Sequence, residues 1–189
     1  MKVLKSKMKV LLIAGAPNPD VSFLRRTFES DKNIDVTTRV ERQGGQFYEG
    51  PLTPAVLEST DCLVLIGYPG SASPADVVRQ VESAASQGKG VLFVPARTID
   101  GSKIQTFQSI LPFTLQSFSG EEEQVFFHIP ESQRNNVIVK QGGAGTSARW
   151  EKLPPLFKLR ASIKAKPESE IIALTRIQNI VTNEPLLLS

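Results

Sequence analysis

Three apolar segments of strand length constrain the fold of this chain more than any other feature. Near-continuous apolar runs are typical of strands that are buried on both faces, and such strands occur in parallel sheets covered by helices. Amphipathic, helix-like patterns separate the three segments. The segments are residues 9–14 (KVLLIA), 61–68 (DCLVLIGY) and 90–95 (GVLFVP). The sequence therefore predicts an α/β fold with a mainly parallel sheet.

Capping residues predict where the helices begin. Asp20 is expected to cap a helix over residues 20–30, and Thr53 precedes a proline that starts a short helix through Ser59. Ser73 is followed by Pro74 and, three residues on, by Asp76, which predicts an N-cap at Ser73. Residues 34–40 alternate apolar and polar side chains, so we expect a half-exposed strand near an edge of the sheet.

Beyond Leu111 the strand-helix alternation gives way to short strand-like pieces. We expect strands at 124–129, 136–140, 159–165 and 170–177, with a hairpin turn over 164–170. These pieces predict an antiparallel β extension from about residue 114, within a single domain covering residues 9–189. Residues 1–8 are expected to be the end of a preceding module or a linker. Both ends read as cut from a longer chain, although a complete protein with an unremarkable terminal strand explains the same residues.

Composition excludes several classes of function. One cysteine and one histidine among 189 residues supply neither an internal disulfide nor a four-ligand zinc site. The net charge of +3 is too small an excess to indicate a nucleic-acid partner. No segment approaches the roughly 18 consecutive apolar residues of a transmembrane helix. We therefore expect no metal, no cofactor, no nucleic-acid partner and no direct insertion of these residues into a membrane.

The loops that follow the buried strands are the first place to look for a ligand, because open parallel sheets bind ligands at their carboxyl ends. The loop GAPNPD contains two prolines, which remove amide donors that a pyrophosphate would need. The loop GYPGSAS could present amides and hydroxyls to an anion, although a tight turn with a helix cap explains the same residues. No catalytic residue is assigned. The candidate ligand-binding residues are Gly15, Pro17, Asp20, Gly70, Ser71 and Arg97.

Other chemically reactive side chains have ordinary structural explanations. Cys62 lies inside an apolar strand, where a thiol is usually inert, and His128 is flanked by aromatic residues. Glu121 to Glu123 form an acidic run that is expected to be a solvated loop, and residues 142–145 resemble a phosphate loop only by composition. Trp150 could belong to a peptide-recognition surface, with a packed aromatic as the simpler interpretation.

The succession KVLLIAGAP, DCLVLIGYPG, a capped helix and GVLFVP resembles the class I glutamine amidotransferase-like superfamily over about residues 9–113. The resemblance implies a three-layer sandwich with a flavodoxin-like, mainly parallel sheet. In catalytic members, the strand corresponding to residues 90–95 leads into a G-x-C-x-G elbow, and a His and a Glu follow later. Here the elbow reads Pro95-Ala96-Arg97, and no H-x-E pair follows it. The family's catalytic roles therefore cannot be carried over to this chain.

A narrower resemblance involves AGAPNPDVSFLRRTFE, GGQFYEG, LPF at 111–113 and WEKLPPL. These segments are similar to the amidotransferase-like domain of large bacterial membrane-anchored proteins with von Willebrand-type or Ig-like modules. The resemblance implies a catalytically inactive binding or assembly module, with protein partners reached through flanking modules or self-association. It also implies an extracytoplasmic location, with a cytoplasmic one as the alternative.

Two other functions remain open from the residues themselves. One is a hydrolase or transferase that uses Ser71 or Ser73 as nucleophile and His128 as base. The other is a small-molecule or carbohydrate-sensing domain that performs no chemistry.

Overall fold

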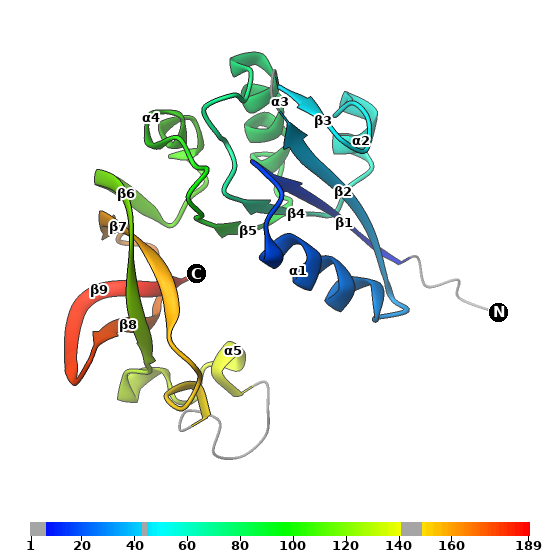
Figure 1. Cartoon of the computed structure of the whole chain (residues 1–189). Helices are drawn as coiled ribbons and strands as arrows, with labels where there is room; N and C mark the ends of the chain where they lie inside the picture. The colour runs from blue at the N-terminus through cyan, green and yellow to red at the C-terminus, as the bar shows by residue number, and fades with distance from the viewer. Residues whose placement is uncertain (1–6, 43–44, 141–148) are drawn as a thin grey trace. The chain divides into compact units, whose positions relative to one another are not determined.

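The structure is a computed structural model that describes residues 7–42, 45–140 and 149–189. The chain divides into two compact units, Met1–Ile110 and Leu111–Ser189, which are coloured blue to green and green to red in Figure 1. One unit holds a mixed sheet of mostly parallel strands, and the other holds an antiparallel sheet, which confirms an α/β protein. Residues 1–6 of the expected linker 1–8, and the glycine-rich segment 142–145, lie outside the described residues.

The first unit alternates strands and helices along the chain. Its elements are β1 (Met8–Ala14), α1 (Pro19–Glu29), β2 (Ile34–Arg42), β3 (Gln46–Phe47), α2 (Pro54–Glu58), β4 (Cys62–Ile66), α3 (Ala75–Ala85), β5 (Gly90–Val94), α4 (Gly101–Ile104) and the 3-10 turn η1 (Gln105–Phe107).

The five-stranded sheet of this unit has the order β3-β2-β1-β4-β5. β2, β1, β4 and β5 run parallel, and the two-residue β3 pairs antiparallel with β2. β2 therefore lies nearer an edge than β1, as its alternating pattern predicts. The interpretation of residues 90–95 as a fully buried strand is wrong, because β5 forms the other edge of the sheet and Leu92 is 41% exposed.

Both faces of the central strands are buried. Figure 1 shows α1 on one side of the sheet and α2 and α3 on the other. Alternate residues of β1 and β4, including Leu12 and Val64, pack with Val21 of α1 in one core cluster. The residues between them, such as Leu11 and Leu63, are also fully buried and point to the opposite face. This double burial explains why β1 and β4 are apolar almost without interruption.

The helix starts differ from the predicted caps at two of three positions. Thr53 caps α2, and its side chain accepts the N–H of Val56. The cap of α1 is Asn18, whose side chain accepts the N–H of Val21, whereas Asp20 lies in the first turn. Pro74 is the cap residue of α3, and no side chain in the described part of the chain caps this helix, so the prediction for Ser73 is wrong. The hydroxyl of Ser73 has other partners, described below.

The second unit is built on the antiparallel sheet β7-β6-β8-β9. Trp150 donates its indole N–H to the carbonyl of Val139 and packs edge-on against Phe127, so it is a packed aromatic. The elements of the second unit are β6 (Phe113–His128), the 3-10 turn η2 (Glu131–Gln133), α5 (Val137–Lys140), β7 (Leu156–Ala165), β8 (Ile171–Ile177) and β9 (Ile180–Leu188).

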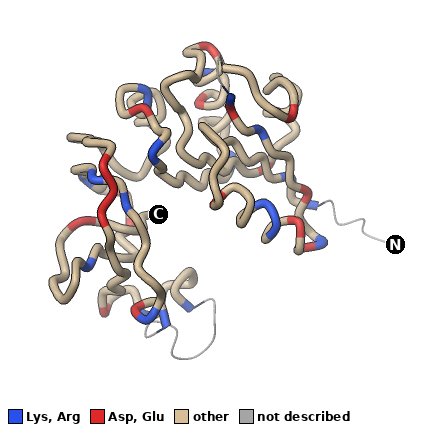
Figure 2. The backbone as a smooth tube through the Cα atoms, viewed as in Figure 1, with Lys and Arg blue, Asp and Glu red and all other residues tan. Residues whose placement is uncertain are grey.

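Three predictions for this unit are wrong. Residues 137–140 are helical rather than a strand, and residues 164–170 are not a hairpin turn, because β7 pairs with β6 and not with β8. The acidic run from Glu121 to Glu123 belongs to β6, visible as the red stretch in Figure 2, and is not a loop. Arg160 of the paired strand β7 lies 3.1 Å from Glu121 and 3.6 Å from Glu123.

Among the described residues, no helix is long and apolar enough to cross a membrane.

Candidate functional site

The carboxyl ends of β1, β4 and β5 meet through their backbones. The N–H of Gly15 donates to the carbonyl of Ile66 at 3.0 Å, and the N–H of Gly67 donates to the carbonyl of Val94 at 2.8 Å. The Thr98 hydroxyl donates to the carbonyl of Gly67 at 3.0 Å. A Cβ on Gly15 would lie 2.1 Å from that same carbonyl oxygen, so no side chain fits there. The loops after the three strands are therefore in backbone contact.

A buried carboxylate lies at this end of the sheet. Glu41, near the end of β2, is 2% exposed, and its Oε2 accepts a hydrogen bond of 2.5 Å from the Ser73 hydroxyl. Its Oε1 has no hydrogen-bond partner among the residues that the structure describes. Burial raises the pKa of Glu41, although the hydrogen bond from Ser73 and the charge of Lys103 oppose the shift. The environment therefore favours the protonated acid more than water does.

The side chains of Ser73 and Lys103 form hydrogen bonds with the backbone of the loop between β4 and α3. The N–H of Gly70 donates to the Ser73 hydroxyl oxygen at 2.8 Å. The Lys103 ammonium donates to the carbonyls of Gly70, Ser71 and Ser73 at 3.1, 2.7 and 2.8 Å. An ammonium has three protons, so these three acceptors use all of them. We refer to Glu41, Gly70, Ser73 and Lys103 as the strand-end cluster.

Tyr68 adds a second buried polar group to this region. Its side chain is fully buried, and its hydroxyl has no hydrogen-bond partner within the described part of the chain. Burial raises the pKa of the Tyr68 phenol, and the negative charges of Glu41 and Asp76 raise it further. The phenol is therefore neutral at ordinary pH, and it can act as a hydrogen-bond donor.

Of the six predicted ligand-binding residues, the structure brings Gly15 and Gly70 close together. A Cβ on Gly70 would be 3.7 Å from the carbonyl oxygen of Gly15. Ser71 and Arg97 are exposed in the neighbouring loops. Pro17 and Asp20 are exposed at the start of α1, and no described contact joins them to Gly70. Ligand binding by these residues stays a prediction.

The two other reactive side chains lie apart from the cluster. Cys62 is the first residue of β4, at the opposite end of that strand from Gly67, and burial raises the pKa of its thiol, with the charge of Asp61 raising it further. His128 ends β6 in the second unit, with its Nδ1 at 3.4 Å from Oε1 of Glu151. Ser71 and Ser73 belong to the first unit, so the pairing of His128 with a serine stays a prediction.

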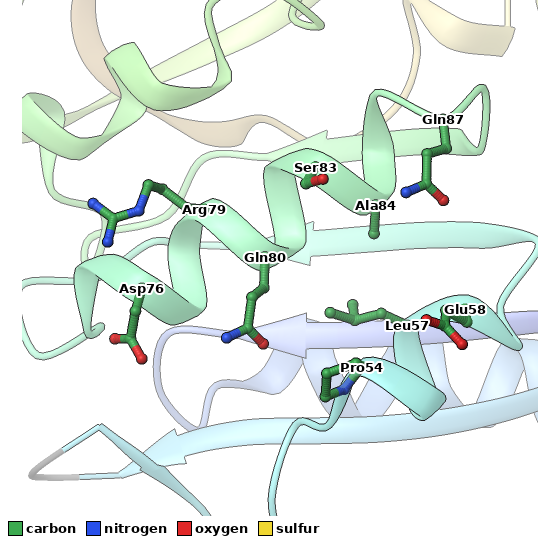
Figure 3. Close-up of a pocket in the computed structure, with 9 residues that line it drawn as sticks. All are labelled: Pro54, Leu57, Glu58, Asp76, Arg79, Gln80, Ser83, Ala84 and Gln87. Atoms are coloured by element: carbon green, nitrogen blue, oxygen red, sulfur yellow. The ribbon is translucent and has the colours of Figure 1, made fainter.

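An open groove runs between α2 and α3, with a volume of about 350 Å³ (Figure 3). Leu57 and Ala84 are buried and form its apolar floor beside Pro54. The rest of the lining is polar and exposed, and it comprises Glu58, Asp76, Arg79, Gln80, Ser83 and Gln87. This concave surface lies within one unit and shares no residue with the strand-end cluster.

The described residues contain no group of three or more His, Cys, Asp or Glu side chains arranged to hold a metal ion. The acidic run on β6, the densest group of carboxylates in the sequence, contacts Lys158 and Arg160 instead.

The sequence offered little to identify Glu41 and Lys103. Glu41 follows Val40 in a strand of alternating polarity, where an acid is expected to point to solvent. Its hydrogen-bond partner is 32 positions away. Lys103 belongs to the short helix α4, and its acceptors are 30 to 33 positions away. The groove-lining residues of α3 do recur at helical spacing, and this spacing can be recognised in the sequence.

Comparisons of this chain with models of protein families, with curated proteins and with solved structures found no match.

Proposed function

We propose that this chain is a non-catalytic binding or assembly module whose first unit is a flavodoxin-like, amidotransferase-like domain. The order of its parallel strands, β2-β1-β4-β5, supports this assignment. Numbered by parallel strand alone, it reads 2-1-3-4, which is the beginning of the flavodoxin-like order 2-1-3-4-5. The resemblance in residues 9–113 supports the same family.

The observation that carries the proposal is that the Ser73 hydroxyl forms hydrogen bonds to two groups of the fold itself. Ser73 is 3% exposed, its proton is donated to Glu41, and its oxygen accepts the N–H of Gly70. A nucleophile must be reachable by substrate and must lie beside a base that takes its proton. Ser73 is almost inaccessible to a substrate, and the oxygen that would have to attack already accepts the N–H of Gly70. The cluster is therefore suited to fixing the loop rather than to a reaction.

The position of the family's nucleophile supports the same conclusion. After β5 the chain continues as Pro95, Ala96 and Arg97, and none of these side chains can attack a carbonyl carbon. Ala96 lies against Gly67, since a Cβ on that glycine would be 3.0 Å from the Ala96 Cβ. A small residue at this place permits the close approach of the two loops. The edge is thus packed where a catalytic member would hold its cysteine.

Two features of the first unit, a loop with a fixed backbone and an open groove, support a binding role. The loop at 70–73 is fixed by Lys103, and the groove between α2 and α3 is lined by exposed polar side chains over an apolar floor. Fixed backbone and a preformed concave surface reduce the entropy lost on binding. Membrane association of a longer parent protein follows from the narrower resemblance alone and stays a prediction.

The test is a pair of hydrolysis assays on the purified full chain. Release of ammonia from glutamine and cleavage of p-nitrophenyl acetate are measured against buffer and against heat-denatured protein. We expect rates equal to the background in both assays. Turnover that is lost in Ser71→Ala or in Cys62→Ala would show that the chain is an enzyme.

A further inference from the structure

The groove between α2 and α3 has a regular architecture along one face of α3. Asp76, Gln80 and Ser83 recur every three or four residues, so they form one stripe along the helix, and Gln87 follows the helix end at Ala85. α3 has 11 residues, so it is about 16 Å long at 1.5 Å of rise per residue. An extended peptide covers that length in about five residues. The groove therefore fits a short extended segment.

Charge is placed at both ends of the groove. Figure 3 shows Asp76 towards one end and Glu58 towards the other, with Pro54 and Leu57 between them. Both acids are exposed, and neither forms an ion pair with a residue that the structure describes. Arg79 is the one basic residue of the lining, and it leaves a net negative charge. The complement of this surface is an apolar centre with a cation on each side.

The geometry of an extended peptide predicts which positions of a bound segment would carry the two cations and the apolar side chain. Side chains one, three and five of an extended segment point to the same side and span about 13 Å. A basic, an aliphatic and a basic side chain at these positions match the order of one acid, the floor of Leu57 and Ala84, and the other acid along the groove. The amides of Gln80 and Gln87 can pair with the peptide backbone, because each carries both donors and an acceptor.

We propose that this groove binds an extended segment of a protein partner with the pattern basic-x-aliphatic-x-basic. The inference rests on the proposed function, because it names the partner chemistry of the binding module. The aliphatic side chain is buried between Leu57, Pro54 and Ala84. The two cations are held by Glu58 and Asp76, and the amides of Gln80 and Gln87 fix the direction of the backbone.

The experiment measures fluorescence anisotropy of labelled pentapeptides with the full chain. The probe is Lys-Ser-Leu-Ser-Lys, and the comparison peptides are Glu-Ser-Leu-Ser-Glu and Lys-Ser-Ser-Ser-Lys. We expect the probe to bind at least about tenfold more tightly than either comparison peptide. The double variant Glu58→Gln/Asp76→Asn should raise the Kd of the probe about tenfold, the order expected for two exposed ion pairs.

Matched controls separate the groove from the net charge of the protein. Asp35→Asn/Glu168→Gln removes two exposed carboxylates outside the groove and should leave the Kd unchanged. Ser83→Trp fills the groove from an exposed position and should abolish binding, whereas Ser22→Trp on α1 should not. Circular dichroism confirms that each variant is folded, and the acid variants test the proposal without any added bulk.

The proposal is overturned if the three peptides bind equally, if none binds, or if the Glu58/Asp76 variant binds the probe as the wild type does. A small molecule that raises Tm in the wild type but not in Ser83→Trp, without peptide binding, would assign the groove to another ligand class. These outcomes differ from failure of the proposed function, which is detected as turnover in the hydrolysis assays.

Discussion

The Ser73 hydroxyl donates a hydrogen bond of 2.5 Å to Oε2 of Glu41, joining β2 to a loop that lies 32 positions later in the chain. The same hydroxyl oxygen accepts the N–H of Gly70 at 2.8 Å. Both side chains are almost completely buried, so neither bond competes strongly with water. The result is a continuous hydrogen-bonded connection from a sheet strand to the backbone of the β4–α3 loop.

The ionisation of Glu41 predicts a dependence of stability on pH. Burial raises the pKa of Glu41 above its ordinary value of 4.5, so the folded chain retains a proton that the unfolded chain releases. The free energy of unfolding therefore falls as pH rises between the ordinary value and the raised one. Glu41→Gln cannot ionise, and it removes this contribution.

Urea unfolding of both proteins from about pH 4 to about pH 8 measures the effect. The free energy of unfolding of the wild type, minus that of Glu41→Gln, should decrease through this window and become constant above the raised pKa. A difference that is flat or that increases with pH would show that the carboxyl is not held in its neutral form by burial.

Lys103 is predicted to stabilise the loop through its three hydrogen bonds to the carbonyls of residues 70, 71 and 73. Lys103→Met keeps the length of the side chain and removes the donors, so it should cost about 1–3 kcal/mol of unfolding free energy. It also removes a positive charge that lowers the pKa of Glu41, so the pH dependence should extend to higher pH. Lys32→Met, at an exposed position, should change stability by less than about 0.5 kcal/mol. Equal stability of the two variants would contradict this role.

The close approach of the strand-end loops predicts different results at two glycines. Gly15→Ala places a Cβ 2.1 Å from the backbone oxygen of Gly67 and should cost about 1–3 kcal/mol or prevent folding. Gly90→Ala meets its nearest atom, Sγ of Cys62, at 3.4 Å, and should be neutral or stabilising by up to about 1 kcal/mol. Thermal unfolding compares the two. If Gly15→Ala were as stable as Gly90→Ala, the loops would not be in contact.

Local patterns in the sequence were sufficient for the two central strands and one helix cap of the first unit. The apolar runs in β1 and β4 and the cap at Thr53 depend on neighbouring residues, and they were predicted. Ser73 was assigned to the wrong role because its local pattern, with Pro74 and Asp76, suits a helix cap. Glu41, a distant residue, binds its hydroxyl instead. A competition between a local and a long-range partner cannot be resolved from spacing.

The second unit shows the same limit for strand pairing. Residues 137–140 are β-branched and lysine, which favours a strand, yet the Asn136 side chain accepts the N–H of Ile138 at 2.9 Å, and the segment turns into α5. The acidic run on β6 is compatible with a strand because Lys158 and Arg160 of β7 lie opposite it. Neither the partner strand nor the register can be derived from either segment by itself.

The most direct test of the central claim compares stability and hydrolysis in Ser73→Ala. The substitution leaves Glu41 and the Gly70 N–H without their buried partner, so it should lower the free energy of unfolding by about 1–3 kcal/mol. Ser71→Ala, at an exposed position in the same loop, should lower it by less than about 0.5 kcal/mol. Hydrolysis of glutamine and of p-nitrophenyl acetate should equal the background in all three proteins. Wild-type turnover that disappears in Ser73→Ala, with unfolding unchanged, would show that this hydroxyl is a nucleophile and not a structural link.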